Sequence, residues 1–165
     1  MFDLKPISQD AIPEALEKAV RYRLLNEPAE AESICLDILR IDPDNQDALV
    51  TMLLALTDQM GSTGTAGRAK TVASRLKGEY ERAYYKGIIC ERAAKARLDH
   101  CAPGAAFSTY DGLREAMEWY EKAEALRPAG NDDAVLRWNT CVRTLAKNPS
   151  LRPRPEEIFE PVLGE

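Results

Sequence analysis

Apolar residues recur at intervals of three and four along most of the chain, the spacing that gathers side chains on one face of an α-helix. Alternation with a period of two, which is typical of half-buried strands, is nearly absent. The pattern predicts an all-α fold of seven helices, at about residues 10–25, 28–41, 45–60, 66–76, 79–98, 112–126 and 132–147. Residues 99–111 contain Pro103 and Gly104 and are predicted to form a loop.

Proline and glycine mark several of the predicted helix ends. Pro13 and Pro28 fall in first turns, where a missing N–H costs nothing, and Gly78 suits the C-terminal cap of the short fourth helix. The link between the first two helices is so short that they are predicted to be antiparallel. Gly87 lies inside the fifth helix, where glycine costs about 1 kcal/mol relative to alanine. It therefore predicts the close approach of a neighbouring helix.

Two helical segments match each other without a gap, residues 30–43 and residues 115–128. In both, an alanine is followed four positions later by a larger packing residue, and a proline closes the segment. Alanine allows a partner helix to approach, the larger residue fills the space beside it, and proline ends the helix so that the next can fold back. The repetition predicts a stacked array of helix pairs. A generic helical bundle with one coincidental match is the alternative.

The repeated pattern resembles the tetratricopeptide repeat family, whose motif is Trp-x2-Leu-Gly-x2-Tyr, then Ala-x3-Phe, then Pro over about 34 residues. The resemblance covers about residues 10–147. The second repeat is degenerate, and the last helix stands as a half repeat. The resemblance assigns repeat packing to Ala19, Tyr22, Ala31, Cys35, Pro43, Gly87, Ala116, Tyr120, Pro128 and Trp138.

The resemblance implies antiparallel helix-turn-helix repeats, about three and a half of them, stacked into a right-handed superhelix. Residues 1–9 are then an N-terminal extension and residues 10–147 the repeat domain. Residues 148–165 hold four prolines and are predicted to form an extended tail.

Composition narrows the class of protein further. The chain has 165 residues, 45% hydrophobic and 30% charged, which excludes a wholly disordered or membrane-embedded protein. Four cysteines without paired spacing predict free thiols in a reducing compartment. The N-terminus shows no signal-peptide pattern, and the longest nearly apolar run spans only residues 48–56. A cytoplasmic location is expected.

Charge is unevenly distributed along the chain. Residues 1–65 carry a balance of −7, residues 66–97 a balance of +6 and the remainder a balance of −4. A basic middle between acidic flanks either pairs with its own neighbours or steers an acidic partner, and pairing or simple solvation is the preferred interpretation. No basic stripe with interleaved aromatic residues is found, so nucleic-acid binding is not expected.

Candidate catalytic groups are few. The single histidine, His100, stands beside Cys101, but no metal-ligand spacing accompanies them. Residues 61–71 lack the spacing of a phosphate-binding loop and follow a helix, so they are interpreted as a connector. No cofactor or metal is expected. An enzymatic or small-ligand-binding subunit that uses the His100/Cys101 loop remains the alternative function.

The resemblance implies a non-catalytic adaptor or scaffold that binds a peptide or protein partner in a concave groove lined by the first helix of each repeat. The acidic, apolar segment 156–163 is predicted to dock on the chain's own surface near the basic region, or on a second copy. Candidate groove residues are those whose side chains suit carboxylates, peptide backbone or flat apolar groups: Arg23, Tyr84, Glu91, Arg92, Arg137, Asn139 and Arg143. Core packing between helices is the preferred alternative for Tyr84, Tyr85 and Trp138, and a solvated helix face is the alternative for the arginines.

Overall fold

The computed structural model describes residues 2–62, 64–99 and 104–155. No strand occurs in these residues, which confirms the all-α prediction. None of the described helices has both the length and the apolarity needed to cross a bilayer. A short 3-10 turn precedes seven α-helices in this part of the chain: α1 (Ile12–Leu24), α2 (Pro28–Ile41), α3 (Gln46–Asp58), α4 (Thr65–Ser74), α5 (Glu79–Asp99), α6 (Ala105–Leu126) and α7 (Asp133–Lys147).

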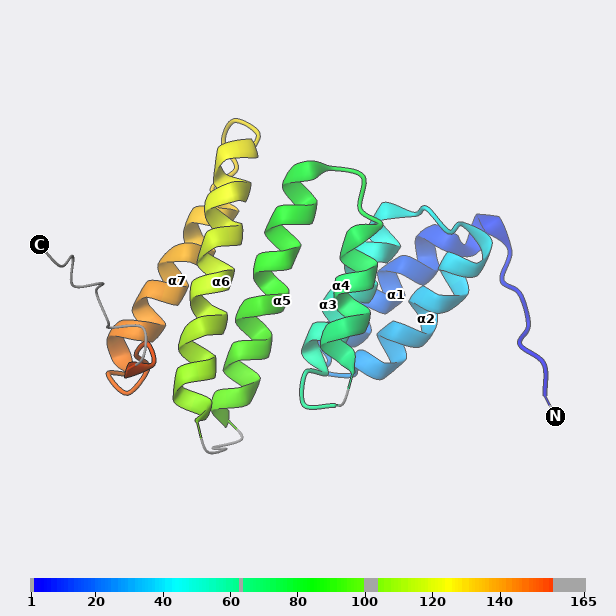
Figure 1. The fold of residues 1–165 in the computed structure, drawn as a ribbon. Coiled ribbons are helices and arrows are strands. Elements are labelled where there is room, and N and C mark those ends of the chain that lie inside the picture. The colour runs from blue at the N-terminus through cyan, green and yellow to red at the C-terminus, as the bar shows by residue number, and fades with distance from the viewer. Residues whose placement is uncertain (1, 63, 100–103, 156–165) are drawn as a thin grey trace, which may run out of the picture.

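The helices stand side by side in a row, with α1 and α2 at one end and α7 at the other (Figure 1). Each helix packs against the next one along the chain. In addition, α1 contacts α3 and α3 contacts α5. Grouped in chain order as the pairs α1/α2, α3/α4 and α5/α6 with α7 left single, the helices have the first members of neighbouring pairs in contact. The handedness of the array stays a prediction.

Helix α6 begins earlier than the sequence pattern predicts. Residues 105–111 were expected in a loop, but they form the first turns of α6. Thr109 is completely buried there and donates a hydrogen bond to the Ala94 carbonyl of α5 at 3.2 Å. A Cβ added to Gly112 would lie 2.9 Å from the Ala94 Cβ, so the two helices approach closely at this point. Packing against α5 thus overrides the low helix propensity of glycine, serine and threonine.

The core consists of two main groups of buried side chains. One is built mainly on α1–α4 and includes Leu49, Leu53 and Leu56, together with Ile89 of α5, all of them completely buried. The other belongs to α5–α7 and centres on Tyr120. Leu54 and Tyr85 pack against both groups. The two halves therefore meet in the core through Ile89 of α5, which belongs to the first group, and through Leu54 and Tyr85.

The residues to which the resemblance assigns repeat packing are buried, partly buried or placed just after a helix end. Both prolines follow a helix end, α2 for Pro43 and α6 for Pro128. Tyr22 and Trp138 are partly buried against the core. Gly87 is buried directly against the Tyr120 ring. Five of the others are completely buried: Ala19, Ala31, Cys35, Ala116 and Tyr120.

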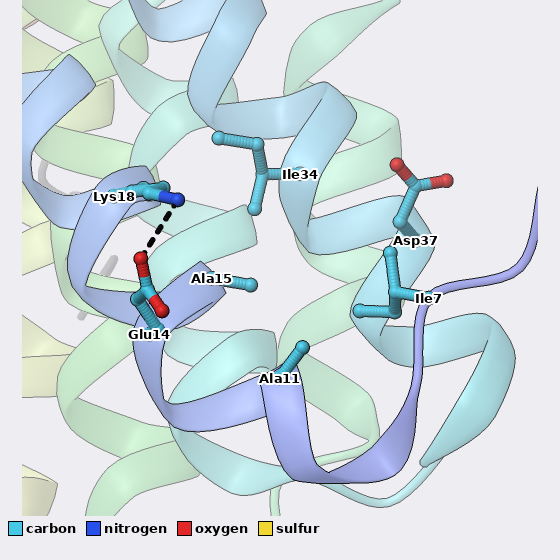
Figure 2. Close-up of a pocket in the computed structure, with 7 residues that line it drawn as sticks. All are labelled: Ile7, Ala11, Glu14, Ala15, Lys18, Ile34 and Asp37. Atoms are coloured by element: carbon cyan, nitrogen blue, oxygen red, sulfur yellow. Dashed lines mark ion pairs between the residues drawn. The ribbon is translucent and has the colours of Figure 1, made fainter.

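The N-terminal end of the row carries a shallow hollow of about 230 Å³. Figure 2 shows Ile7 from the N-terminal extension and Ile34 from α2 on its apolar side, with the Glu14–Lys18 ion pair on its rim. Ile7 packs against the small group of buried side chains formed by Ile12, Ile38 and Ala48. The last residues of the extension therefore belong to the packed end of the array.

The predicted tail also begins later than expected. Leu151 is only 5% exposed and packs with the core of α5–α7. Its backbone N–H bonds to the Asn148 carbonyl at 2.9 Å, which turns the chain back after α7. Burial of the hydrophobic Leu151 side chain therefore keeps residues 148–151 on the fold despite the neighbouring prolines, and of the predicted tail only residues 156–165 lie outside the described part of the chain.

Candidate functional site

The first helices of the three pairs are joined by a run of ion pairs. Asp58, at the end of α3, accepts from the Arg23 Nε of α1 at 2.8 Å and also pairs with Arg92 of α5. Arg92 donates a second hydrogen bond to the Thr57 hydroxyl at 2.7 Å. One carboxylate therefore holds two arginines from different helices. The structure brings together Arg23 and Arg92, two of the predicted groove residues, through an aspartate that the sequence did not single out.

A second cluster joins α5, α6 and α7 around Glu91. One carboxylate oxygen, Oε1, is 2.5 Å from Lys95 Nζ and 2.8 Å from Arg137 Nη2. The other, Oε2, accepts a hydrogen bond from the Tyr120 hydroxyl at 2.7 Å. Glu91 is completely buried, so the expectation that its side chain faces an open groove is wrong. A buried carboxylate needs such partners, because an unpaired one costs several kcal/mol.

The first cluster lies on α1, α3 and α5, and the second on α5, α6 and α7. We call the charged residues of the two clusters together the ladder face. They are Arg23, Asp58, Glu91, Arg92, Lys95 and Arg137. The ladder face carries four cations and two carboxylates. The cationic side chains stay 20% to 38% exposed, whereas Glu91 is covered. Arg137 Nε is buried without a hydrogen-bond partner. The accessible charge of the ladder face is therefore positive.

The remaining predicted groove residues lie elsewhere. Tyr84 belongs to an aromatic cluster, with ring centroids 5.8 Å from Tyr80, 5.1 Å from Tyr85 and 6.1 Å from Tyr120. Burial raises the pKa of Tyr84 to about 12, with Asp133 adding to the effect.

Asn139 and Arg143 both lie on α7. At about 100° per residue, Asn139 lies on the side of α7 away from Arg137, and Arg143 shares a face with Asn139. Asn139 is half-buried and Arg143 is exposed. The structure does not bring these two residues into the ladder face.

The basic segment is partly neutralised within the fold. Within this segment, residues 66–97, Arg68 pairs with Glu32 of α2 and Arg92 pairs with Asp58 of α3. Both carboxylates belong to the acidic N-terminal part of the chain. Arg75 donates to the Pro43 carbonyl at 2.5 Å. Pairing within the chain, one of the two interpretations preferred over steering of a partner, is confirmed for Arg68 and Arg92. Lys70 and Lys86 make no ion pair with a described residue.

Sequence reasoning missed Asp58, Lys95 and the role of the Tyr120 hydroxyl. The sequence does indicate that Glu91 is buried. Glu91 follows Gly87 by four residues and therefore lies on the same face of α5 as the apolar residues. A carboxylate in such a register must find partners on the facing helices. Nothing in the sequence showed that these would be Tyr120 and Arg137.

The described part of the chain contains neither an exposed cysteine nor a cluster of side chains suited to binding a metal ion. Cys35, Cys90 and Cys141 are buried free thiols, and burial raises the pKa of each to about 12. They are therefore held as unreactive thiols at neutral pH. No group of three histidine, cysteine or acidic residues suited to a metal occurs among residues 2–62, 64–99 and 104–155. The His100/Cys101 loop lies outside the described residues.

Comparison with protein families, curated proteins and solved structures finds no match to this chain.

Proposed function

We propose that the chain is a non-catalytic interaction module that binds an acidic segment of a partner protein on its ladder face. The observation that carries the proposal is the shared carboxylate of Asp58, which holds Arg23 and Arg92 side by side. A guanidinium group binds a carboxylate through two parallel hydrogen bonds, so this pair offers more donors than one aspartate can use. An incoming carboxylate has donors already held in place.

The Glu91 cluster supports the same proposal by fixing a second pair of cations. Glu91 is inaccessible, so it holds Lys95 and Arg137 without competing at the surface. Lys95 is 38% exposed and Arg137 is 30% exposed, which leaves part of each side chain open to a ligand. Cations held by a buried anion lose less conformational entropy on binding than free surface side chains do.

The helix arrangement supports placing the chain among tetratricopeptide-like arrays. Antiparallel pairs, touching first helices and buried alanines at the repeat positions are what such an array requires. In that family the first helices line the binding groove, and the ladder face lies on α1, α3, α5 and the capping helix α7.

A direct test uses a labelled peptide of ten glutamates and its ten-glutamine counterpart, with the full chain titrated in each case. The glutamate peptide is expected to bind at least tenfold more tightly at low salt, and binding is expected to weaken as salt rises. Arg92→Glu is expected to lower this affinity at least tenfold.

The matched control is Arg40→Glu, which changes the same charge at an exposed position on α2. Equal losses in Arg92→Glu and Arg40→Glu, or equal binding of the two peptides, would overturn the proposal.

A further inference from the structure

A groove lies away from the ladder face, beside α4, which is much shorter than α5 and α6. Helix α4 has 10 residues, whereas α5 has 21 and α6 has 22. Beside it, a hollow of about 410 Å³ lies between α5 and α6 and adjoins a smaller hollow of about 150 Å³ next to α4. Trp119 and Lys86 line both hollows, so we treat them as one feature, the Trp119 groove.

The Trp119 groove combines an aromatic surface with unpaired positive charge. Lys86 Nζ lies 4.5 Å and Lys122 Nζ 4.2 Å from the centre of the Trp119 ring. Lys70 also lines the groove, and none of the three lysines forms an ion pair with a described residue. Two ammonium groups on one indole repel each other, and a carboxylate placed between them would remove that repulsion.

The Trp119 groove is also lined by apolar side chains, and it has more cationic than anionic side chains. Ala83 and Leu126 line it, and Leu126 is 47% exposed. Two carboxylates, Glu79 and Glu115, also line it, against four cations when Arg82 is included with the three lysines. The groove therefore suits a segment that carries both acidic and large apolar side chains.

The described chain ends close to this groove. Leu151 is anchored in the core, and Arg154 reaches Asp111 of α6 at 3.7 Å. Pro153 lines a further hollow together with Glu115, which also lines the Trp119 groove. The chain thus leaves the fold on α6, beside one end of the groove.

The sequence that follows has the chemistry the groove requires. Residues 156–165 contain four glutamates together with Ile158, Phe159, Val162 and Leu163. Ten residues span at most about 35 Å, whereas Glu115 and Leu126 are about 16 Å apart along α6. The segment is therefore long enough to reach the whole groove from Pro155.

We propose that residues 156–165 dock in the Trp119 groove of the same chain, with glutamates against Lys86 and Lys122 and Phe159 against the Trp119 indole. The surface involved differs from the ladder face, so the proposal does not depend on the proposed function. Docking there covers the partly buried indole further and gives the three lysines the ion-pair partners that the described residues do not supply.

The test is amide hydrogen exchange of Ile158, Phe159, Glu160, Val162 and Leu163 in the full chain, compared with a free peptide of residues 156–165. Exchange in the chain is expected to be at least tenfold slower than in the free peptide. The double substitution Lys86→Glu/Lys122→Glu is expected to restore the free-peptide rates. The matched control, Lys5→Glu, changes one charge at the far end of the chain and is expected to leave protection unchanged.

A second readout does not touch the folded domain. Phe159→Ala is expected to shift the Trp119 indole resonance and to leave that of Trp138 unchanged. Free-peptide exchange rates in the unmodified chain would overturn the proposal. Protection that falls on dilution would also overturn it, because the groove would then hold the segment of a second copy.

Discussion

Gly87 packs so closely against the ring of Tyr120 that even one methyl group added at this position would collide with it. A Cβ at this position would lie 2.5 Å from the Tyr120 Cε1 and 2.7 Å from its Cδ1, well inside van der Waals contact. The Tyr120 ring is completely buried, and its hydroxyl is hydrogen-bonded to Glu91 at 2.7 Å. The ring has no free direction in which to move without breaking that bond.

The expected effect of Gly87→Ala follows from three opposing contributions. Replacing a mid-helix glycine gains about 1 kcal/mol of helix propensity. Overpacking a well-filled core costs about 1–3 kcal/mol, and loss of a hydrogen bond to a charged buried group costs about 1.5–3 kcal/mol. We expect a net loss of about 1.5–5 kcal/mol in the free energy of unfolding.

Urea denaturation followed by tryptophan fluorescence measures this loss, since Trp119 and Trp138 lie in α6 and α7. The matched control is Gly67→Ala in α4, where an added Cβ meets nothing within 4 Å. That substitution is expected to be neutral or to stabilise by up to about 1 kcal/mol. The reasoning is refuted if Gly87→Ala is as stable as the unmodified chain.

Four further results are expected from the same denaturation assay. Tyr120→Phe leaves Glu91 Oε2 without its donor and should cost about 1.5–3 kcal/mol, whereas Tyr110→Phe should change stability by less than about 0.5 kcal/mol. Asp58→Asn removes the carboxylate shared by two arginines and should cost about 1 kcal/mol, a loss that shrinks in 1 M salt. Leu151→Ala should cost about 2 kcal/mol or more, because a nearly buried side chain leaves a cavity; no loss would show that residues 148–155 do not belong to the fold. In the presence of reductant, stability should fall as pH rises above about 9, because the folded state retains protons that the unfolded thiols release, by up to about 1.4 kcal/mol per pH unit for each of Cys35, Cys90 and Cys141.

The sequence predicts those parts of the fold in which local pattern and tertiary packing agree. The apolar stripes of α1, α2 and α3 have clear stop signals, so their positions follow from periodicity. The first turns of α6 do not, because Gly104, Ser108 and Gly112 favour a loop until α5 packs against them. Leu151 shows the same limit, since an isolated apolar residue among prolines carries no periodicity.

The candidate site is less predictable because its bonds join residues far apart in the chain. Arg23 and Asp58 are 35 positions apart, and Tyr120 and Glu91 are 29 apart. A polar residue on a helix face shows which side it occupies, but its partner depends on how neighbouring helices are rotated and spaced. For Glu91, the apolar register indicated burial, whereas its charge suggested an open groove, and burial prevailed.

The division of the core into two groups joined through few side chains has a consequence for cooperativity. Each half has its own buried centre, and the core contacts between them come from Ile89 of α5, which is buried in the first group, and from Leu54 and Tyr85, which pack against both. In a one-dimensional array, such a weak interface lets one half open while the other stays folded. Native-state hydrogen exchange should then show two sets of amides with separate opening free energies, one in α1–α4 and one in α5–α7. A ligand on the ladder face spans both halves through Asp58 and Arg92, so its binding would couple the two opening reactions into one.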